Sequence, residues 1–172
     1  EHLRLMTAFQ PWQVSVGYQR RTYATSRLLK SFVESGVFGP LKAISIAEGG
    51  RTTRTQGWGG YQDQSVVAGG GIIKNLGCHS LDLAFWISGA NGYSIVNRHV
   101  EWDGDTDRAG SAKLRLHGMS HTAGSECDFK WGVSWLSEQP NTVELHFERV
   151  TIRSMSAPDT KVEIIDAHGK KL

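Results

Sequence analysis

The second half of the chain is a series of short alternating segments, and this pattern constrains the fold more than any other feature. Alternation of apolar and polar residues predicts strands with one buried face, and Gly, Pro, Asn and Asp between the segments predict turns. Short connections favour antiparallel pairing of consecutive strands. We therefore expect strands over residues 96–100, 109–116, 121–131, 143–147, 151–155 and 161–165.

The first half of the chain shows mainly helical spacing of apolar residues. It predicts a helix over 3–9 that Pro11 ends, and a second over 22–35 that stops at Gly36. Short strands are expected over 14–18 and 41–47, and a long connection over 49–68 leads to a helix that ends at Gly89. The whole pattern predicts an α+β domain: an open, mostly antiparallel sheet with helices packed on one face.

Length and charge exclude several classes of protein. A chain of 172 residues is long enough for one domain and short for two. Its formal net charge of +2 argues against nucleic acid or membrane partners. The sequence has no apolar run of about 18 residues and no leader pattern. Because the chain starts at Glu1 within a helical pattern, we expect it to be a piece of a longer protein.

Cysteine and histidine usage indicates neither a disulfide framework nor a metal site. The chain has two cysteines, Cys78 and Cys127, and seven histidines without a metal-binding spacing. We expect no metal, a reducing cytoplasmic location, and packed cysteines that do not act as nucleophiles.

The segment from Gly69 to Asp82 is the best candidate for an active site. A run of three glycines, which allows a backbone to approach a ligand closely, leads into a helical pattern that carries Asn75, His79 and Asp82. Histidine is suited to proton transfer near neutral pH. On a regular helix Asn75 and His79 share one face, so the amide would orient the imidazole or bond a substrate; the alternative is that Asn75 is a helix N-cap. For His79 the alternative is a structural histidine bonded to backbone.

Five features, taken in order, resemble the Gfo/Idh/MocA oxidoreductases, the group of glucose–fructose oxidoreductase and inositol dehydrogenase. They are Val16-Gly17-Tyr18-Gln19-Arg20-Arg21, Gly36-x-x-Gly39-Pro40-Leu41, Gly69-Gly70-Gly71-x-x-x-Asn75-x-Gly77-x-His79-x-x-Asp82, Gly89, and Trp135 with Asn141-Thr142-Val143-Glu144-Leu145.

The resemblance implies a two-domain enzyme of which this chain is the second domain. Residues 1–17 would close a dinucleotide-binding domain that lies mostly upstream, and 18–172 would form the substrate-binding and oligomerisation domain. NAD or NADP would be bound mainly by the missing domain, because the chain contains neither a G-x-G-x-x-G fingerprint nor the family's Glu-Lys-Pro motif. His79 matches the family's acid/base histidine, and Asn75 stands where many members have aspartate. Asp82 is expected to be a structural carboxylate that bonds backbone or an arginine.

Two further clusters could contact ligands. Tyr18, Arg20 and Arg21 lie where the family places residues near the cofactor, although an arginine pair that caps the next helix is an equal alternative. The long connection holds candidate substrate contacts, since aromatic faces stack on sugars and arginines bind carboxylates or phosphates; the alternative is a solvated loop. These candidates are Arg51, Arg54, Trp58 and Tyr61, with Lys74 as a weaker one that is otherwise a solvated lysine.

The sequence thus predicts the C-terminal domain of an NAD(P)-dependent oxidoreductase that acts on a hydroxyl or keto group of a sugar, inositol or nucleotide sugar. The chain alone is expected to be inactive. Alternatives are a non-catalytic dimerisation or ligand-binding module and, less favoured, a hydrolase of the same superfamily. The second sheet face would pack on another copy in a homodimer or tetramer, or else be solvated.

Overall fold

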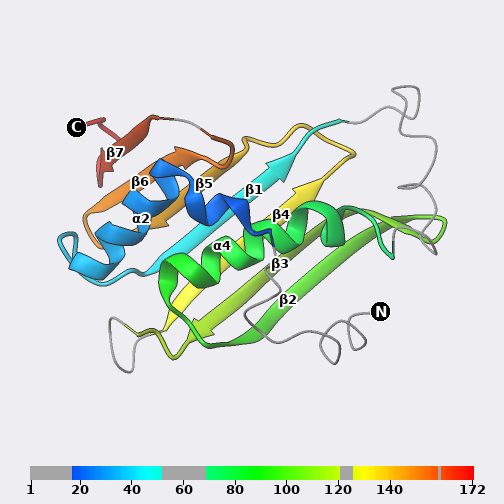
Figure 1. Ribbon diagram of the computed structural model, residues 1–172, viewed down its shortest axis with the longest axis horizontal. Coiled ribbons are helices and arrows are strands. Elements are labelled where there is room, and N and C mark those ends of the chain that lie inside the picture. Colours follow the sequence, from blue (N-terminus) through cyan, green and yellow to red (C-terminus); the bar gives the residue numbers. More distant parts are fainter. Residues whose placement is uncertain (1–16, 52–68, 121–125, 159) are drawn as a thin grey trace.

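A seven-stranded sheet organises the computed structural model, which describes residues 17–51, 69–120, 126–158 and 160–172 (Figure 1). The strand order is β2-β3-β4-β1-β5-β6-β7, and every neighbouring pair is antiparallel except β1 with β4. The sheet is therefore open and mostly antiparallel, as expected. The strands are β1 (Ala43–Gly49), β2 (Gly92–Asp103), β3 (Thr106–His117), β4 (Cys127–Ser134), β5 (Thr142–His146), β6 (Val150–Met155) and β7 (Val162–Asp166).

Two strands differ most from their expected bounds, and the others differ by one to three residues at an end. β2 runs from residue 92 to 103 instead of 96 to 100, because it pairs with β3 along its whole length despite irregularities between Ile95 and Asn97 and between Glu101 and Trp102. Such bulges break the alternation of side chains and hide the strand from a period-two pattern. β4 starts at Cys127 and continues to Ser134, whereas the expectation was 121–131; residues 121–125 lie outside the described part.

The helices lie together on one face of the sheet, as predicted (Figure 1). Helix α2 (Ala24–Ser35) ends at Gly36 and α4 (Cys78–Ser88) ends at Gly89, and both glycines adopt the left-handed conformation that residues with a Cβ disfavour. The helix expected over 22–35 starts two residues later because Thr22 belongs to a 3₁₀ turn, η2 (Gln19–Thr22). A single π turn, η3 (Ile73–Gly77), precedes α4.

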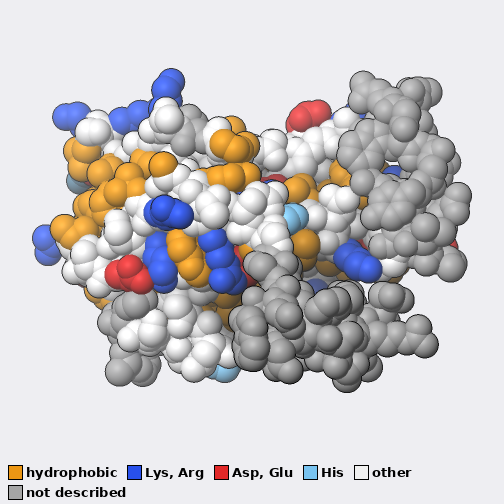
Figure 2. All heavy atoms as spheres, viewed as in Figure 1, with side chains coloured by type: hydrophobic (Ala, Val, Ile, Leu, Met, Phe, Trp, Pro, Cys, Tyr) orange, Lys and Arg blue, Asp and Glu red, His pale blue; other side chains and the backbone are white. Residues whose placement is uncertain are grey.

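The hydrophobic core fills the layer between the helices and the sheet. Alternate side chains of β1, β4 and β5 point into it, with Ile44, Phe129 and Leu145 almost fully buried. Helices α2 and α4 contribute Leu29, Val33, Leu83, Ala84 and Ile87. Lys and Arg side chains gather over the seam between α2 and α4 on the outer surface (Figure 2).

Two expectations about chain order need correction. We expected helices in the first half and the sheet in the second, but β1 from the first half lies in the sheet centre between β4 and β5. We expected a strand over 14–18, of which only Gly17 and Tyr18 lie in the described part. These two residues are irregular and lead into η2. No helix in the described ranges is long and apolar enough to cross a membrane.

Candidate active site

The glycine run before α4 packs against a buried carboxylate of β3. The backbone N–H groups of Gly71 and Ile73 donate to the two oxygens of Asp107, Oδ1 and Oδ2, each at 2.7 Å. A Cβ on Gly71 would come within 2.0 Å of the Asp107 carbonyl oxygen, so only glycine allows this approach. The carboxylate also complements the positive end of the helix dipole. We expected the glycines to let the backbone approach a ligand. Among the described residues, they let it approach Asp107.

The first turn of this helical segment, which carries Asn75, is a π turn. Asn75 lies inside η3 and is exposed, and its backbone N–H bonds the Gly71 carbonyl at 3.0 Å. Four residues make slightly more than one α turn and slightly less than one π turn, so Asn75 and His79 lie on about the same face in either case. Asn75 is not the N-cap of α4, because that position is Gly77. Within the described part of the chain the Asn75 amide makes no hydrogen bond to Nδ1 of His79, so the expected orienting contact is not shown.

His79 lies in the first turn of α4 without a hydrogen bond that would fix its role as structural. Its Nδ1 atom is buried and has no hydrogen-bond partner within the part of the chain that the structure describes. The ring contacts Tyr18 instead, in a T-shaped arrangement with centroids 6.1 Å apart and an interplanar angle of 87°. A histidine that served only to tie a helix start to nearby backbone would use this nitrogen in a bond. Within the described residues the structure therefore does not show the backbone-bonded histidine of the structural alternative.

Two ion pairs hold η2 against the rest of the domain. Arg21 donates from Nε to Asp82 Oδ2 at 2.8 Å, and its Nη2 contacts Oδ1 of the same carboxylate. This bidentate hydrogen bonding raises the pKa of Arg21 above its ordinary value. Arg20 pairs with Glu48, a buried residue at the end of β1. Asp82 is therefore the arginine-bonded structural carboxylate that the sequence predicted.

These pairs decide what the arginines offer to a ligand. Both guanidinium groups already bind carboxylates of this domain, and Arg20 is only 11% exposed. With the helix start occupied by Asp107, the described residues contain no cradle for the phosphates of a dinucleotide. The predicted cofactor contacts of Tyr18, Arg20 and Arg21 stay predictions, now restricted to the ring of Tyr18 and the more exposed Arg21.

The start of α4 is fixed to the sheet by Trp131 of β4. The indole Nε1 donates to Ser80 Oγ at 2.8 Å, and Ser80 Oγ donates to the Gly77 carbonyl at 3.1 Å. A Cβ on Gly77 would lie 2.6 Å from Cζ2 of the indole, so this glycine permits close packing of helix on strand. These contacts hold the first turn of α4, which carries His79, against β4.

The expected substrate contacts are only partly described. Lys74 is exposed beside the glycine run. Its Nζ atom lies 2.2 Å from the position that a Cβ on Gly69 would occupy. Arg51 is exposed, and its backbone N–H bonds Glu138 Oε1 at 3.1 Å. Arg54, Trp58 and Tyr61 lie outside the described residues. The described residues hold no group of three or more His, Cys, Asp or Glu that could bind a metal ion, and both cysteines are free.

Sequence reasoning missed Asp107, Glu48 and Trp131. Glu48 follows Ile44 and Ile46 in phase in β1, and Asp107 lies near the start of β3; each is at most 5% exposed. A buried charge requires partners, so an acidic residue in phase with buried apolar ones is the signal that could have found Glu48. Asp107 gives no such signal, because it is out of phase with the buried Leu114 and Leu116, and a register shift separates it from them. The packing of Trp131 on Gly77 leaves no local signal, because 54 residues separate the two (131 minus 77).

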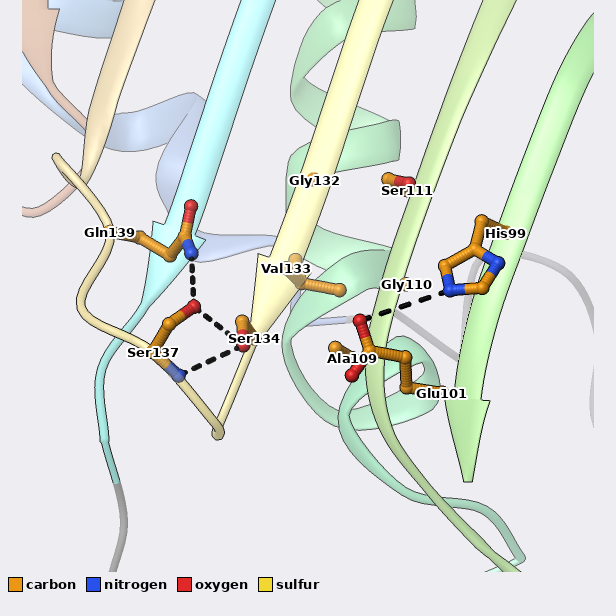
Figure 3. A pocket seen from close by; sticks show the side chains of 10 residues that line it. All are labelled: His99, Glu101, Ala109, Gly110, Ser111, Gly132, Val133, Ser134, Ser137 and Gln139. Carbon is orange, nitrogen blue, oxygen red and sulfur yellow. Dashed lines mark hydrogen bonds and ion pairs between the residues drawn. The ribbon is translucent and has the colours of Figure 1, made fainter. Parts of the chain in front are cut away.

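The opposite, helix-free face of the sheet carries a shallow hollow of about 170 Å³ (Figure 3). Small residues form its floor, and polar side chains surround it. On one side, Nε2 of His99 lies 3.8 Å from Oε1 of Glu101, both on β2. On the other side, hydrogen bonds join Gln139 to Ser137 and Ser137 to Ser134. The lining residues are His99, Glu101, Ala109, Gly110, Ser111, Gly132, Val133, Ser134, Ser137 and Gln139.

Comparison with known proteins agrees with this geometry. An open, mostly antiparallel sheet with helices on one face is shared with oxidoreductases of known structure. The family model of the GFO/IDH/MocA C-terminal domain matches residues 26–153, and the chain belongs to that family. No curated protein matches the chain in sequence.

Three solved structures illustrate the similarity. They are the aldose-aldose oxidoreductase from Caulobacter crescentus complexed with glycerol (16% identity, TM-score 0.68), levoglucosan dehydrogenase in complex with NADH and levoglucosan (15%, 0.69), and an NAD-binding protein from Listeria innocua (16%, 0.67). They cover 91%, 91% and 88% of this chain, but the chain covers only 45%, 44% and 40% of theirs. At such identities the likeness shows the fold alone, and the chain spans less than half of each neighbour.

Proposed function

We propose that this chain is the substrate-binding domain of an NAD(P)-dependent oxidoreductase that interconverts a hydroxyl and a keto group on a sugar-like substrate. His79 would accept the hydroxyl proton in the oxidising direction and return it in the reducing direction. The hydride acceptor in this proposal is NAD or NADP, held mainly outside these residues. The glycerol and levoglucosan bound to two structural neighbours support a polyhydroxylated substrate.

The state of His79 carries the proposal. The imidazole sits at the start of a helix that two contacts fix to the sheet, Asp107 on the backbone and Trp131 on Ser80. A third contact, Arg21 on Asp82, fixes the helix to η2. A general base must be held in a defined position and must still have a nitrogen free for the proton. His79 lies on such a helix. Its Nδ1 is buried and no described group bonds it, so we propose that the substrate proton passes through the other ring nitrogen, Nε2.

Asn75 changes the mechanism rather than removing it. A carboxylate at this position could stabilise the imidazolium that forms after proton transfer, whereas an amide is neutral. Because Asn75 is exposed and does not bond His79 in the described structure, we propose that His79 works without an acidic partner. Asn75, Lys74 and the residues of the long connection, including Arg51, would then contact the substrate.

The test is His79→Gln in the full-length gene product, screened with sugars and nucleotide sugars while NADH or NADPH absorbance is followed. Loss of a positioned acid–base group should lower kcat by about 10²–10⁴-fold. His168→Gln is the matched control, because His168 is exposed and, within the described part of the chain, bonds through its backbone N–H to Asp166. Unchanged turnover in His79→Gln would remove His79 from the mechanism, and a full-length protein without any turnover would favour the non-catalytic module.

The cofactor part of the proposal has its own test. Since the described residues hold no phosphate cradle, the 172-residue chain should neither bind nor reduce nicotinamide dinucleotides. Calorimetric titration with NAD and NADP should give no heat of binding at micromolar concentrations. Micromolar affinity of the chain alone would contradict the assignment of the cofactor to another domain.

We further propose that the helix-free face packs on a second copy. This face alternates charged pairs, such as Arg153 with Glu144 at 2.7 Å, with hollows floored by small residues such as Gly132 and Ser111 (Figure 3). Shallow hollows and projecting charges of both signs suit a self-complementary interface. Sedimentation of the full-length protein should therefore show a dimer or tetramer, and Gly132→Arg should dissociate it; a monomer would refute this proposal.

A further inference from the structure

Tyr18 is joined to His79 by a closed loop of contacts. The Tyr18 ring meets the imidazole in the T-shaped arrangement described above, and the Arg21 guanidinium carbon lies 5.6 Å from the centroid of the same ring. Arg21 binds Asp82, which is three residues after His79 on α4. The path therefore runs from His79 to Tyr18, to Arg21, to Asp82, and back along one turn of the helix.

The loop is also fixed to the sheet. Arg20, between Tyr18 and Arg21, pairs with the buried Glu48 of β1, and the Arg21 backbone N–H donates to the Tyr18 carbonyl at 3.2 Å. The turn that carries Tyr18 is thus attached to β1 on one side and to α4 on the other. A ring held this way has little freedom to move relative to the imidazole.

Orientation of an acid–base histidine usually comes from a hydrogen bond to one of its nitrogens. In the described structure Nδ1 of His79 has no such bond, and Asn75 does not supply one. Aromatic rings that meet edge to face have a preferred geometry, so a fixed ring can orient another without using its nitrogens. The Tyr18 ring is the aromatic partner that the structure gives to His79.

We propose that Tyr18 is a positioning residue for His79: its ring, and not its hydroxyl, holds the imidazole in the orientation for proton transfer. The inference rests on the proposed acid/base role of His79. It assigns the Arg20–Glu48 and Arg21–Asp82 pairs the task of fixing the Tyr18 ring, in place of direct contact with a dinucleotide.

The test compares Tyr18→Leu and Tyr18→Phe in the full-length protein, each made with and without His79→Gln. An aromatic pair contributes enough that Tyr18→Leu should lower kcat by about 2- to 10-fold, with KM unchanged. Tyr18→Phe keeps the ring and should retain wild-type kcat. Because Tyr18 acts through His79, Tyr18→Leu should cause no further loss in the His79→Gln background.

Tyr93→Leu is the matched control. Tyr93 of β2 makes the same kind of T-shaped contact with the same helix, at Phe85, with centroids 5.8 Å apart, and Phe85 lies six residues after His79. It should leave kcat unchanged, which separates loss of ring positioning from general weakening of α4.

Three results would overturn the inference while leaving the role of His79 intact: an equal loss for Tyr18→Leu in both backgrounds, a loss confined to KM, or a Tyr18→Phe variant as impaired as Tyr18→Leu. A Tyr18→Leu variant with wild-type kcat would overturn it as well. If His79→Gln itself turns over normally, the proposed function fails first.

Discussion

The carboxylate of Asp107 should contribute strongly to stability, because it accepts two backbone hydrogen bonds at the start of the helical segment. Asp107→Asn tests this, since asparagine keeps the shape but replaces the charged acceptor with one neutral oxygen and an amide that donates. The amide nitrogen would then face a backbone N–H, either of Gly71 or of Ile73. One buried donor would lose its acceptor and the other would keep only a neutral one.

The magnitude follows from those two bonds. Hydrogen bonds to a charged group contribute about 1.5–3 kcal/mol each, and a neutral one about 0.5–1.5 kcal/mol. Replacing two hydrogen bonds to a charged group by one to a neutral group would cost about 2–4 kcal/mol of unfolding free energy. Part of this loss is recovered, because asparagine buries no charge. Asp107 is only 5% exposed, so water cannot replace the missing acceptor. We expect a net loss of about 2–3 kcal/mol, which lowers Tm by about 5–10 °C for a domain of this size.

Chemical and thermal denaturation of the 172-residue chain measures this loss, and amide hydrogen exchange locates it. The Gly71 and Ile73 amides should exchange much faster in Asp107→Asn. Asp128→Asn is the matched control, because Asp128 pairs with Arg115 on the surface at 3.2 Å and is 67% exposed. Such a pair contributes about 0–1 kcal/mol. A loss below about 1 kcal/mol in Asp107→Asn, or one no larger than in the control, would refute the reasoning.

Two other predictions concern packing and pH. Gly77→Ala should cost about 1–3 kcal/mol in denaturation, because its Cβ would lie 2.6 Å from Trp131, whereas Gly17→Ala, with nothing within 4 Å, should cost far less. Burial, aided by Asp128, raises the pKa of Cys127 from 9.0 to about 12. Below pH 9 the thiol stays protonated in both states and its contribution is complete; above pH 9 the unfolded chain ionises first. Stability should therefore fall by about 1.4 kcal/mol per pH unit from this group between pH 9 and 12. Cys127→Ala should show a shallower fall over that range, and identical slopes would contradict the assignment.

Local patterns were enough to predict most of the architecture. Alternation located β3, β5 and β6 to within a few residues, because each has one face on the core. It also located β7 to within one residue, although every residue of that strand is half-buried. The glycines at 36 and 89 marked both helix ends, because the left-handed conformation there is a property of the residue itself. Features set by a single residue type or a short period can be derived from sequence.

The geometry of the site depends on contacts between distant residues, and these were not predictable. The π turn of η3 has no separate pattern in the sequence. The central position of β1 depends on pairing with β4 and β5, about 90 residues later in the chain. Just before β5, the Asn141 side chain accepts from the backbone N–H of Gly49 and donates to the Gly49 carbonyl. Asn141 itself adopts a positive φ of 53°, which asparagine tolerates better than most residues.

The glycine run shows why a motif alone does not define a ligand site. A helix start with free N–H groups attracts anions, so three glycines before a helix invite a phosphate-binding interpretation. Here Asp107 already accepts from Gly71 and Ile73, and its negative charge would repel a phosphate at the same place. The helix start therefore serves to fix His79, not to bind a dinucleotide. In the function that we propose, the phosphates of the dinucleotide are therefore bound away from this helix start, and His79 of α4 transfers the proton.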